Sequence, residues 1–336
     1  MNSISLSRAS IAAAVAVCAS LPPLALAQDS SKLTTLTVEQ ACAVMAKKPN
    51  TVSSIDGSFA SFDALTALTP DVAEVLVKQE GALSFNGLTE LSPETAAVLA
   101  KHAPTRGFGS ADLRLNGLKA LSPKAAEALA AHQGKVLLYS LEKLDSIPLA
   151  QKLARQWGEL RLGITDLSPE TAAELAKHRG TEEDKTRPGV TFRRRDGAAS
   201  VLRLDNITSL SPETAEVLAA HEGVLVLNGL TSLPPAVAAS LAKRTGNSKT
   251  KRTGTLVLNG LETLSTESAA ALAGFTGELV LKAITEIKTD TAAALAKHKG
   301  RLHLTGLAKL TPETHAALKI HPSLLLPHPL PLTAAN

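Results

Sequence analysis

Apolar and polar residues follow one repeated phrase along most of this chain. Residues 83–102 read Leu-Ser-Phe-Asn-Gly-Leu-Thr-Glu-Leu-Ser-Pro-Glu-Thr-Ala-Ala-Val-Leu-Ala-Lys-His, and residues 113–132 and 202–221 repeat this phrase closely. Its opening Leu-x-Leu alternates with a period of two, which predicts a short strand. Its Ala- and Leu-rich second half predicts a helix with a narrow apolar stripe. Each copy therefore predicts one strand-turn-helix unit.

The polar positions of the phrase predict where each element begins and ends. Asn-Gly after the strand indicates a turn, because both residues tolerate positive φ. Ser-Pro-Glu-Thr indicates a helix start, with Ser as N-cap, Pro at the first helical position and Glu near the positive end of the dipole. Lys-His followed by Gly indicates the helix end. All local signals agree with the same unit.

The spacing of the units predicts a stacked solenoid. The Leu or Ile that precedes the helix start recurs about eleven times, and six of the ten spacings are 23 residues, with none shorter. The other four spacings correspond to insertions of 9, 7, 20 and 8 residues into a fixed unit. These positions are Leu36, Leu68, Leu91, Leu121, Leu144, Leu167, Leu210, Leu233, Leu264, Ile287 and Leu310.

The phrase Leu-x-Leu-Asn-Gly-Leu-x-x-Leu-Ser-Pro-Glu-Thr resembles the roughly 23-residue repeats of bacterial leucine-rich-repeat proteins. The resemblance covers residues 33–326 and differs from the family by one residue in the spacing after the strand. It implies an α/β fold, a right-handed solenoid of short parallel strands and helices, and a role in protein binding. Two units are poorer copies, residues 136–157 and 160–167, and we expect a local irregularity there.

The chain is predicted to begin with a cleavable signal peptide over residues 1–27. Arg8 precedes an apolar run, and a small-x-small cleavage pattern ends at Ala27. This predicts export to the periplasm, the cell surface or the medium. A capping helix and linker follow over residues 28–57, then the solenoid over residues 58–326. Its insertions lie near residues 103–112, 181–200 and 245–254, and a Pro-rich tail occupies residues 327–336.

Repeated polar residues within the unit are interpreted as structural. Five histidines recur at the helix end, where a partly exposed imidazole would complement the dipole and cap carbonyl groups. A metal-binding column is the alternative, but no carboxylate or cysteine recurs beside them. Asn after the strand is expected to bond the backbone of the adjacent unit, and Glu at the helix start to complement the dipole. These histidines are His102, His132, His178, His221 and His298.

No sequence motif predicts catalysis. The chain has no phosphate-binding glycine loop, no Gly-x-Ser-x-Gly and no His-Glu-x-x-His. Repeated carboxylates would have identical surroundings, whereas acid–base pairs need two unlike ones. We therefore expect no enzyme activity, no catalytic residue, no bound metal and no cofactor.

The insertions carry the residues predicted to bind a partner. Two insertions are basic, which suits an anionic glycan, a lipid headgroup or an acidic protein. The alternative is a solvated loop, since Glu182, Glu183, Asp184 and Asp196 offset much of the charge of the longer insertion. The predicted binding residues are Arg193, Arg194, Arg195, Lys249, Lys251, Arg252, Phe108 and Phe192.

Composition narrows the function only a little. Apolar residues make up 44% of the chain, enough for a large core, while aromatic residues make up 2%, which leaves few recognition anchors. We predict a monomeric, non-catalytic binding or scaffolding protein whose partner is another protein. The alternative is a binder of anionic polysaccharide or of the cell envelope. Export makes nucleic acid an unexpected partner, and no transmembrane segment is expected in the mature chain.

Overall fold

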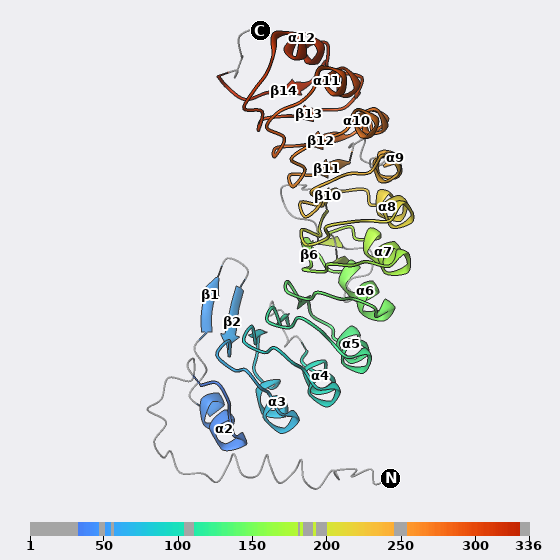
Figure 1. Cartoon of the computed structure of the whole chain (residues 1–336). Helices are drawn as coiled ribbons and strands as arrows, with labels where there is room; N and C mark the ends of the chain where they lie inside the picture. The colour runs from blue at the N-terminus through green and yellow to red at the C-terminus, as the bar shows by residue number, and fades with distance from the viewer. Residues whose placement is uncertain are drawn as a thin grey trace. The chain divides into compact units, whose positions relative to one another are not determined.

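The computed structural model describes residues 33–46, 51–54, 57–103, 111–180, 182–183, 191–192, 200–244 and 254–329. The predicted signal peptide, residues 1–27, lies outside them. The described chain is an α/β repeat solenoid, in which helices alternate with short, mostly parallel strands, as the sequence predicts (Figure 1). It divides into two compact units, Met1–Leu141 and Glu142–Asn336. The division falls in the stretch predicted to be irregular.

The first unit has a five-stranded sheet with the order β1-β2-β3-β4-β5. β1 and β2 pair antiparallel, and the other neighbours are parallel. α2 and β1 occupy the stretch predicted to be a capping helix and linker. The elements are α2 (Val38–Ala46), β1 (Thr51–Ser54), β2 (Gly57–Ser61), α3 (Pro70–Leu76), β3 (Ala82–Ser84), α4 (Pro93–Leu99), β4 (Leu113–Arg114), α5 (Pro123–Ala130) and β5 (Val136–Leu137).

The second unit has a seven-stranded parallel sheet with the order β14-β13-β12-β11-β10-β9-β6, and a separate antiparallel pair of β7 and β8. Its helices stack in chain order beside the sheet (Figure 1). The strands are β6 (Glu159–Arg161), β7 (Glu182–Glu183), β8 (Thr191–Phe192), β9 (Val201–Arg203), β10 (Val224–Val226), β11 (Thr255–Val257), β12 (Glu278–Val280), β13 (Leu302–His303) and β14 (Leu324–Leu325). The helices are α6 (Ile147–Ala154), α7 (Pro169–Ala176), α8 (Pro212–Ala219), α9 (Pro235–Ala242), α10 (Thr266–Leu272), α11 (Thr289–Leu295) and α12 (Pro312–Lys319).

Leucines at matching strand positions form the core of each unit. Leu202, Leu225, Leu256 and Leu279 are in register on neighbouring strands, and each is fully buried. Burying one such side chain contributes about 1.5–3 kcal/mol. The repeated leucine therefore fixes the register of the strands and holds successive layers together.

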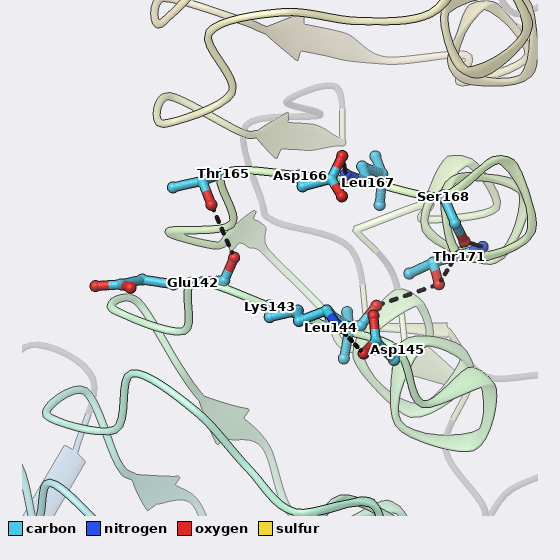
Figure 2. A network of polar contacts seen from close by, with 9 residues as sticks. All are labelled: Glu142, Lys143, Leu144, Asp145, Thr165, Asp166, Leu167, Ser168 and Thr171. Atoms are coloured by element: carbon cyan, nitrogen blue, oxygen red, sulfur yellow. Dashed lines mark hydrogen bonds and ion pairs between the residues drawn. The ribbon is translucent and has the colours of Figure 1, made fainter.

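Helix starts are capped and also tied to the preceding layer. The Ser168 hydroxyl accepts a hydrogen bond from the Thr171 backbone N–H. The buried Thr171 hydroxyl donates to the Leu144 carbonyl of the preceding repeat at 3.2 Å (Figure 2). Thr95 and Thr214 make the same bond to Leu68 and Leu167. The Thr of Ser-Pro-Glu-Thr thus has a bonding role that the sequence analysis did not assign.

Asn residues after the strands bond the next layer, as predicted. The Asn86 side chain accepts from the Asn116 backbone N–H at 3.1 Å, and the Asn116 side chain accepts from the Tyr139 N–H at 3.2 Å. Asn228 and Asn259 repeat this pattern in the second unit. Each Asn satisfies a backbone donor that has no partner within its own turn.

The position after Asn requires glycine for a different reason from the one predicted. The glycines with positive φ that the structure describes are Gly81, Gly158 and Gly180, none of which belongs to an Asn-Gly pair. At Gly260, a Cβ atom would lie 1.9 Å from the Asn228 carbonyl oxygen of the preceding layer. Glycine is therefore required by the close approach of two turns.

Candidate functional site

The structure describes the backbone of one of the eight residues predicted to bind a partner. Phe192 lies in β8, opposite Glu182 of β7. The other seven lie outside the described residues: Phe108, Arg193, Arg194, Arg195, Lys249, Lys251 and Arg252.

The two basic insertions return to the same edge of the second unit's sheet. The longer insertion ends where β9 begins at Val201, and the shorter one ends where β11 begins at Thr255. β10 lies between these strands, with Val224 in register with both residues. Since neighbouring strands are about 4.8 Å apart, the two returning segments enter the sheet about 10 Å apart. Tertiary structure thus brings the described ends of the two insertions, Ser200 and Gly254, to neighbouring places on the sheet.

At this edge, one side chain from the helix end of each repeat is buried, and these side chains form a column that is mostly polar. The prediction that these histidines are partly exposed is wrong, because their relative exposures are 0–2%. His102 places Nδ1 3.0 Å from the Val77 carbonyl oxygen and Nε2 2.7 Å from the Gly81 carbonyl oxygen. The ring therefore links the end of the preceding helix to the start of its own repeat's strand.

His132 and His178 hold the same positions in their repeats. His132 reaches the carbonyl oxygens of Ala100 and Ala111, at 3.4 and 2.7 Å. Because Ala100 and Ala111 flank residues 103–110, this imidazole holds together the two ends of the first solenoid insertion. The rings stack along the column, with centroids 6.3 Å apart for the pairs His102–His132 and His178–His221.

Other residue types occupy the column where histidine is absent. Gln156, Arg244 and Phe275 are buried at the same position, and His321 extends the column to the last repeat. Arg244 is 2% exposed and donates to the carbonyl oxygens of Leu218 at 3.4 Å and Gly223 at 2.8 Å. The sequence analysis did not identify Arg244 and Phe275 as members of the column. Both lie eleven residues after the Leu that precedes their helix start, and this spacing could have identified them.

Burial controls the protonation of this column in the second unit. Burial, together with the charges of Arg244 and His178, lowers the pKa of His221 to about 3. Burial also lowers the pKa values of His298 and His321. The pKa of Arg244 is lowered by burial to about 10, so its guanidinium remains charged at neutral pH. Neutral imidazoles therefore lie beside one buried cation.

One face of the second unit's sheet carries a row of side chains with polar ends. Arg203, Val226, Val257, Val280 and His303 are in register on β9 to β13. At one end, Arg203 pairs with Glu159 at 2.6 Å. At the other end, His303 Nε2 lies 2.7 Å from a Glu278 carboxylate oxygen. Val226 and Val280 are buried, so Val257 is the apolar residue of the row that is partly exposed.

The polar side chains described above make hydrogen bonds and ion pairs within and between repeats. They contain no group of three or more His, Cys, Asp or Glu side chains that could hold a metal ion. Backbone hydrogen bonds at helix starts lower the pKa values of Glu170 and Glu267, and the result for Glu170 agrees with the role predicted for that carboxylate. No helix in the described part of the chain is long and apolar enough to cross a membrane. Comparison with protein-family models and with curated proteins finds no match to this chain.

Proposed function

We propose that this protein is an exported, non-catalytic binding or scaffolding protein that holds another protein on its repeat solenoid. The observation that carries this proposal is the row on one face of the second unit's sheet, in which Arg203, Val257 and His303 are partly exposed. An apolar residue bordered by polar residues fits the apolar core and polar rim of a protein interface. The leucine-rich-repeat resemblance supports the same role by analogy.

Site-specific photo-crosslinking tests the protein-binding proposal. A photoreactive amino acid replaces Val257 at the centre of the row, and in a matched variant it replaces Glu216, whose side chain is 56% exposed. We expect one protein adduct from the envelope or secreted fraction with the Val257 probe, and its loss when Arg203 and His303 are changed to Glu. Equal adducts from both probes would contradict a specific sheet-face interface.

Export is tested by the N-terminus of the mature chain. A protein recovered from outside the cytoplasm should begin at Gln28, since cleavage after Ala27 removes the predicted signal peptide. An N-terminus at Met1 would contradict cleavage. Sedimentation of the same sample tests the expected monomer.

A second candidate function is binding of an anionic glycan or envelope surface through the basic insertions. The return of both insertions to one sheet edge supports it, because two clusters of positive charge attract an anion more strongly than one. Trp157 provides the measurement, since it is the only tryptophan and forms a β-bridge with Gly180, directly before the longer insertion.

The test is a fluorescence titration with a linear polyuronate. We expect a change in Trp157 emission that weakens as salt rises, because exposed charges are screened. A variant with all six basic insertion residues changed to Ser should lose this response. An unchanged response in the variant would leave the insertions as solvated loops.

A further inference from the structure

Exposed cations recur at the C-terminal ends of helices in the second unit. Arg155, Lys177 and Lys243 are the C-cap residues of α6, α7 and α9, and Lys297 occupies the corresponding repeat position after α11. We call these four residues the cationic row. All four are exposed.

Each member of the cationic row directly precedes one residue of the buried column, so the row runs alongside the column. These column residues are Gln156, His178, Arg244 and His298. Ring centroids of adjacent column residues are 5.7–6.3 Å apart. From α6 to α11 there are five such steps, so the row extends over about 30 Å. The charges therefore form a line along one edge of the unit.

Three repeats of the second unit lack a row cation: those of α8 and α10 follow a basic insertion, whereas that of α12 has Ile320 at the row position and follows no insertion. Ala220 and Gly274 hold the row position in the repeats of α8 and α10. The strands of these repeats, β9 and β11, directly follow residues 181–200 and 245–254. From α6 to α11, each repeat therefore either has a row cation or is preceded by a basic insertion.

Both paired lysines of the row remain open to solvent. Lys177 pairs with Glu174 and Lys243 pairs with Glu216, each at 2.8 Å, and both lysine side chains are more than half exposed. The Glu174 side chain is 17% exposed, whereas that of Glu216 is 56% exposed. The exposed Lys243–Glu216 pair contributes only about 0–1 kcal/mol, so a polyanion can replace this carboxylate at little cost.

An exposed aromatic ring lies at one end of the row. Trp157 is 36% exposed and forms a β-bridge with Gly180. The neighbouring Arg179 side chain is 45% exposed and pairs with Glu222 at 3.7 Å. Arg155 is two residues from Trp157. An indole face can pack against the C–H face of a sugar ring, and guanidinium groups bind carboxylates or sulfates with two hydrogen bonds. This end of the row therefore combines the chemistry needed for an acidic sugar.

We infer that the cationic row, with Trp157 and Arg179, is a binding site for a linear acidic polysaccharide that lies along the helix-end edge of the second unit. This inference rests on the second candidate function and adds a site outside the insertions. A line of charges suits a polymer with one acidic group per sugar. A membrane surface would instead favour cations spread over a plane.

The test compares three variants of the full mature chain by isothermal titration calorimetry with oligogalacturonates, a disaccharide and a dodecamer. The row variant changes Arg155, Lys177, Lys243 and Lys297 to Ser. The control variant changes four other exposed lysines of the same unit to Ser, which gives the same loss of charge: Lys143, Lys282, Lys288 and Lys309. The insertion variant is the six-residue variant described above.

We expect the wild type to bind the dodecamer more tightly than the disaccharide. The row variant should bind the dodecamer at least about tenfold more weakly, while the control variant stays within about twofold of wild type. Equal affinities of the row and control variants would overturn the inference. So would row-dependent binding of phosphatidylglycerol vesicles or single-stranded DNA without binding of the oligogalacturonate.

The insertion variant separates this inference from the function on which it rests. If only the insertion variant loses binding and the row variant is unaffected, the cationic row is not the binding site, and the second candidate function is retained. Absence of binding by the wild type would overturn both. Circular dichroism of each variant checks that the fold is retained.

Discussion

At the scale of single residues, one buried side chain closes most repeats. An imidazole suits this position because its two nitrogens lie near two carbonyl oxygens, as those of His178 lie 3.1 Å from the Ala154 oxygen and 2.9 Å from the Gly158 oxygen, and a neutral ring can donate its one N–H to either of them. The guanidinium group of Arg244 donates to two carbonyl oxygens at once. The helix-end carbonyls cannot find partners within their own helix, so these side chains supply the missing donors.

Arg244 should contribute more to stability than its neighbour Lys243. In Arg244→Met, the carbonyl groups of Leu218 and Gly223 lose their donor while remaining buried, and we expect the free energy of unfolding to fall by about 2 kcal/mol. In Lys243→Met, only an exposed ion pair is lost, and the change should stay within about 1 kcal/mol. Urea denaturation measures both. Equal effects would contradict a special role for the buried guanidinium.

The second unit should lose stability in acid. The pKa of His221 is about 3 in the folded chain, against 6.5 for an unperturbed histidine, so the unfolded chain binds a proton that the folded chain does not. Stability is therefore greatest above pH 6.5 and falls as the pH decreases, by up to about 1.4 kcal/mol per pH unit for this residue. His298 and His321 act in the same direction.

Urea midpoints at pH 7 and pH 5 measure this loss. A His221→Gln variant cannot titrate at this position, and its stability should depend less steeply on pH. Wild-type stability that rises on acidification would contradict the assignment of a neutral, buried imidazole.

At the scale of elements, close contact between successive turns sets the tightest limit on the sequence. The turns after the strands approach one another so closely that their Gly positions, which follow Asn in most repeats and Thr305 in one, have no room for a Cβ atom. Gly260, Gly229 and Gly306 all lie against a carbonyl oxygen of the preceding layer. The helix ends are less constrained, since a Cβ atom at Gly274 would meet its nearest neighbour at 3.4 Å.

Gly260→Ala and Gly274→Ala should therefore have opposite outcomes. The first variant forces two backbones apart, and we expect a loss of about 3 kcal/mol in the free energy of unfolding. The second fits without strain and should change stability by less than about 1 kcal/mol, with a gain favoured by reduced freedom of the unfolded chain. Thermal denaturation distinguishes the two. A harmless Gly260→Ala would show that the turns can separate.

At the scale of the whole molecule, the chain consists of two compact units with separate sheets. Each sheet buries its own row of leucines, and the division lies between Leu141 and Glu142. Stability of a repeat protein depends mainly on contacts between neighbouring layers. The weakest repeat copies in the sequence coincide with this division.

We expect the two units to unfold at different urea concentrations. Trp157, the only tryptophan, reports on the second unit, and Tyr139, the only tyrosine, belongs to the first. Far-UV circular dichroism reports on both units together. A Trp157 transition that differs from the circular dichroism transition would support separate unfolding. Coincident transitions would indicate one cooperative unit.

Sequence patterns could predict the fold but only part of the candidate site. The 23-residue spacing and the Ser-Pro-Glu-Thr phrase are local signals, and they identified the strand-turn-helix unit and the helix caps. The burial of His102 and the bond from Thr171 to Leu144 depend on the preceding layer, so no local pattern contained them. Arg244 was missed because it replaces histidine with a different residue type.

The sequence by itself determined the solenoid, because a repeated core leucine every 23 residues can be buried only by stacking one layer on the next. It also determined the role of the Asn positions. Tertiary structure alone decided which repeats form each compact unit, which carbonyl groups the buried column bonds, and that Arg155, Lys177, Lys243 and Lys297 form a line. These features depend on contacts between layers, where residues far apart in sequence become neighbours.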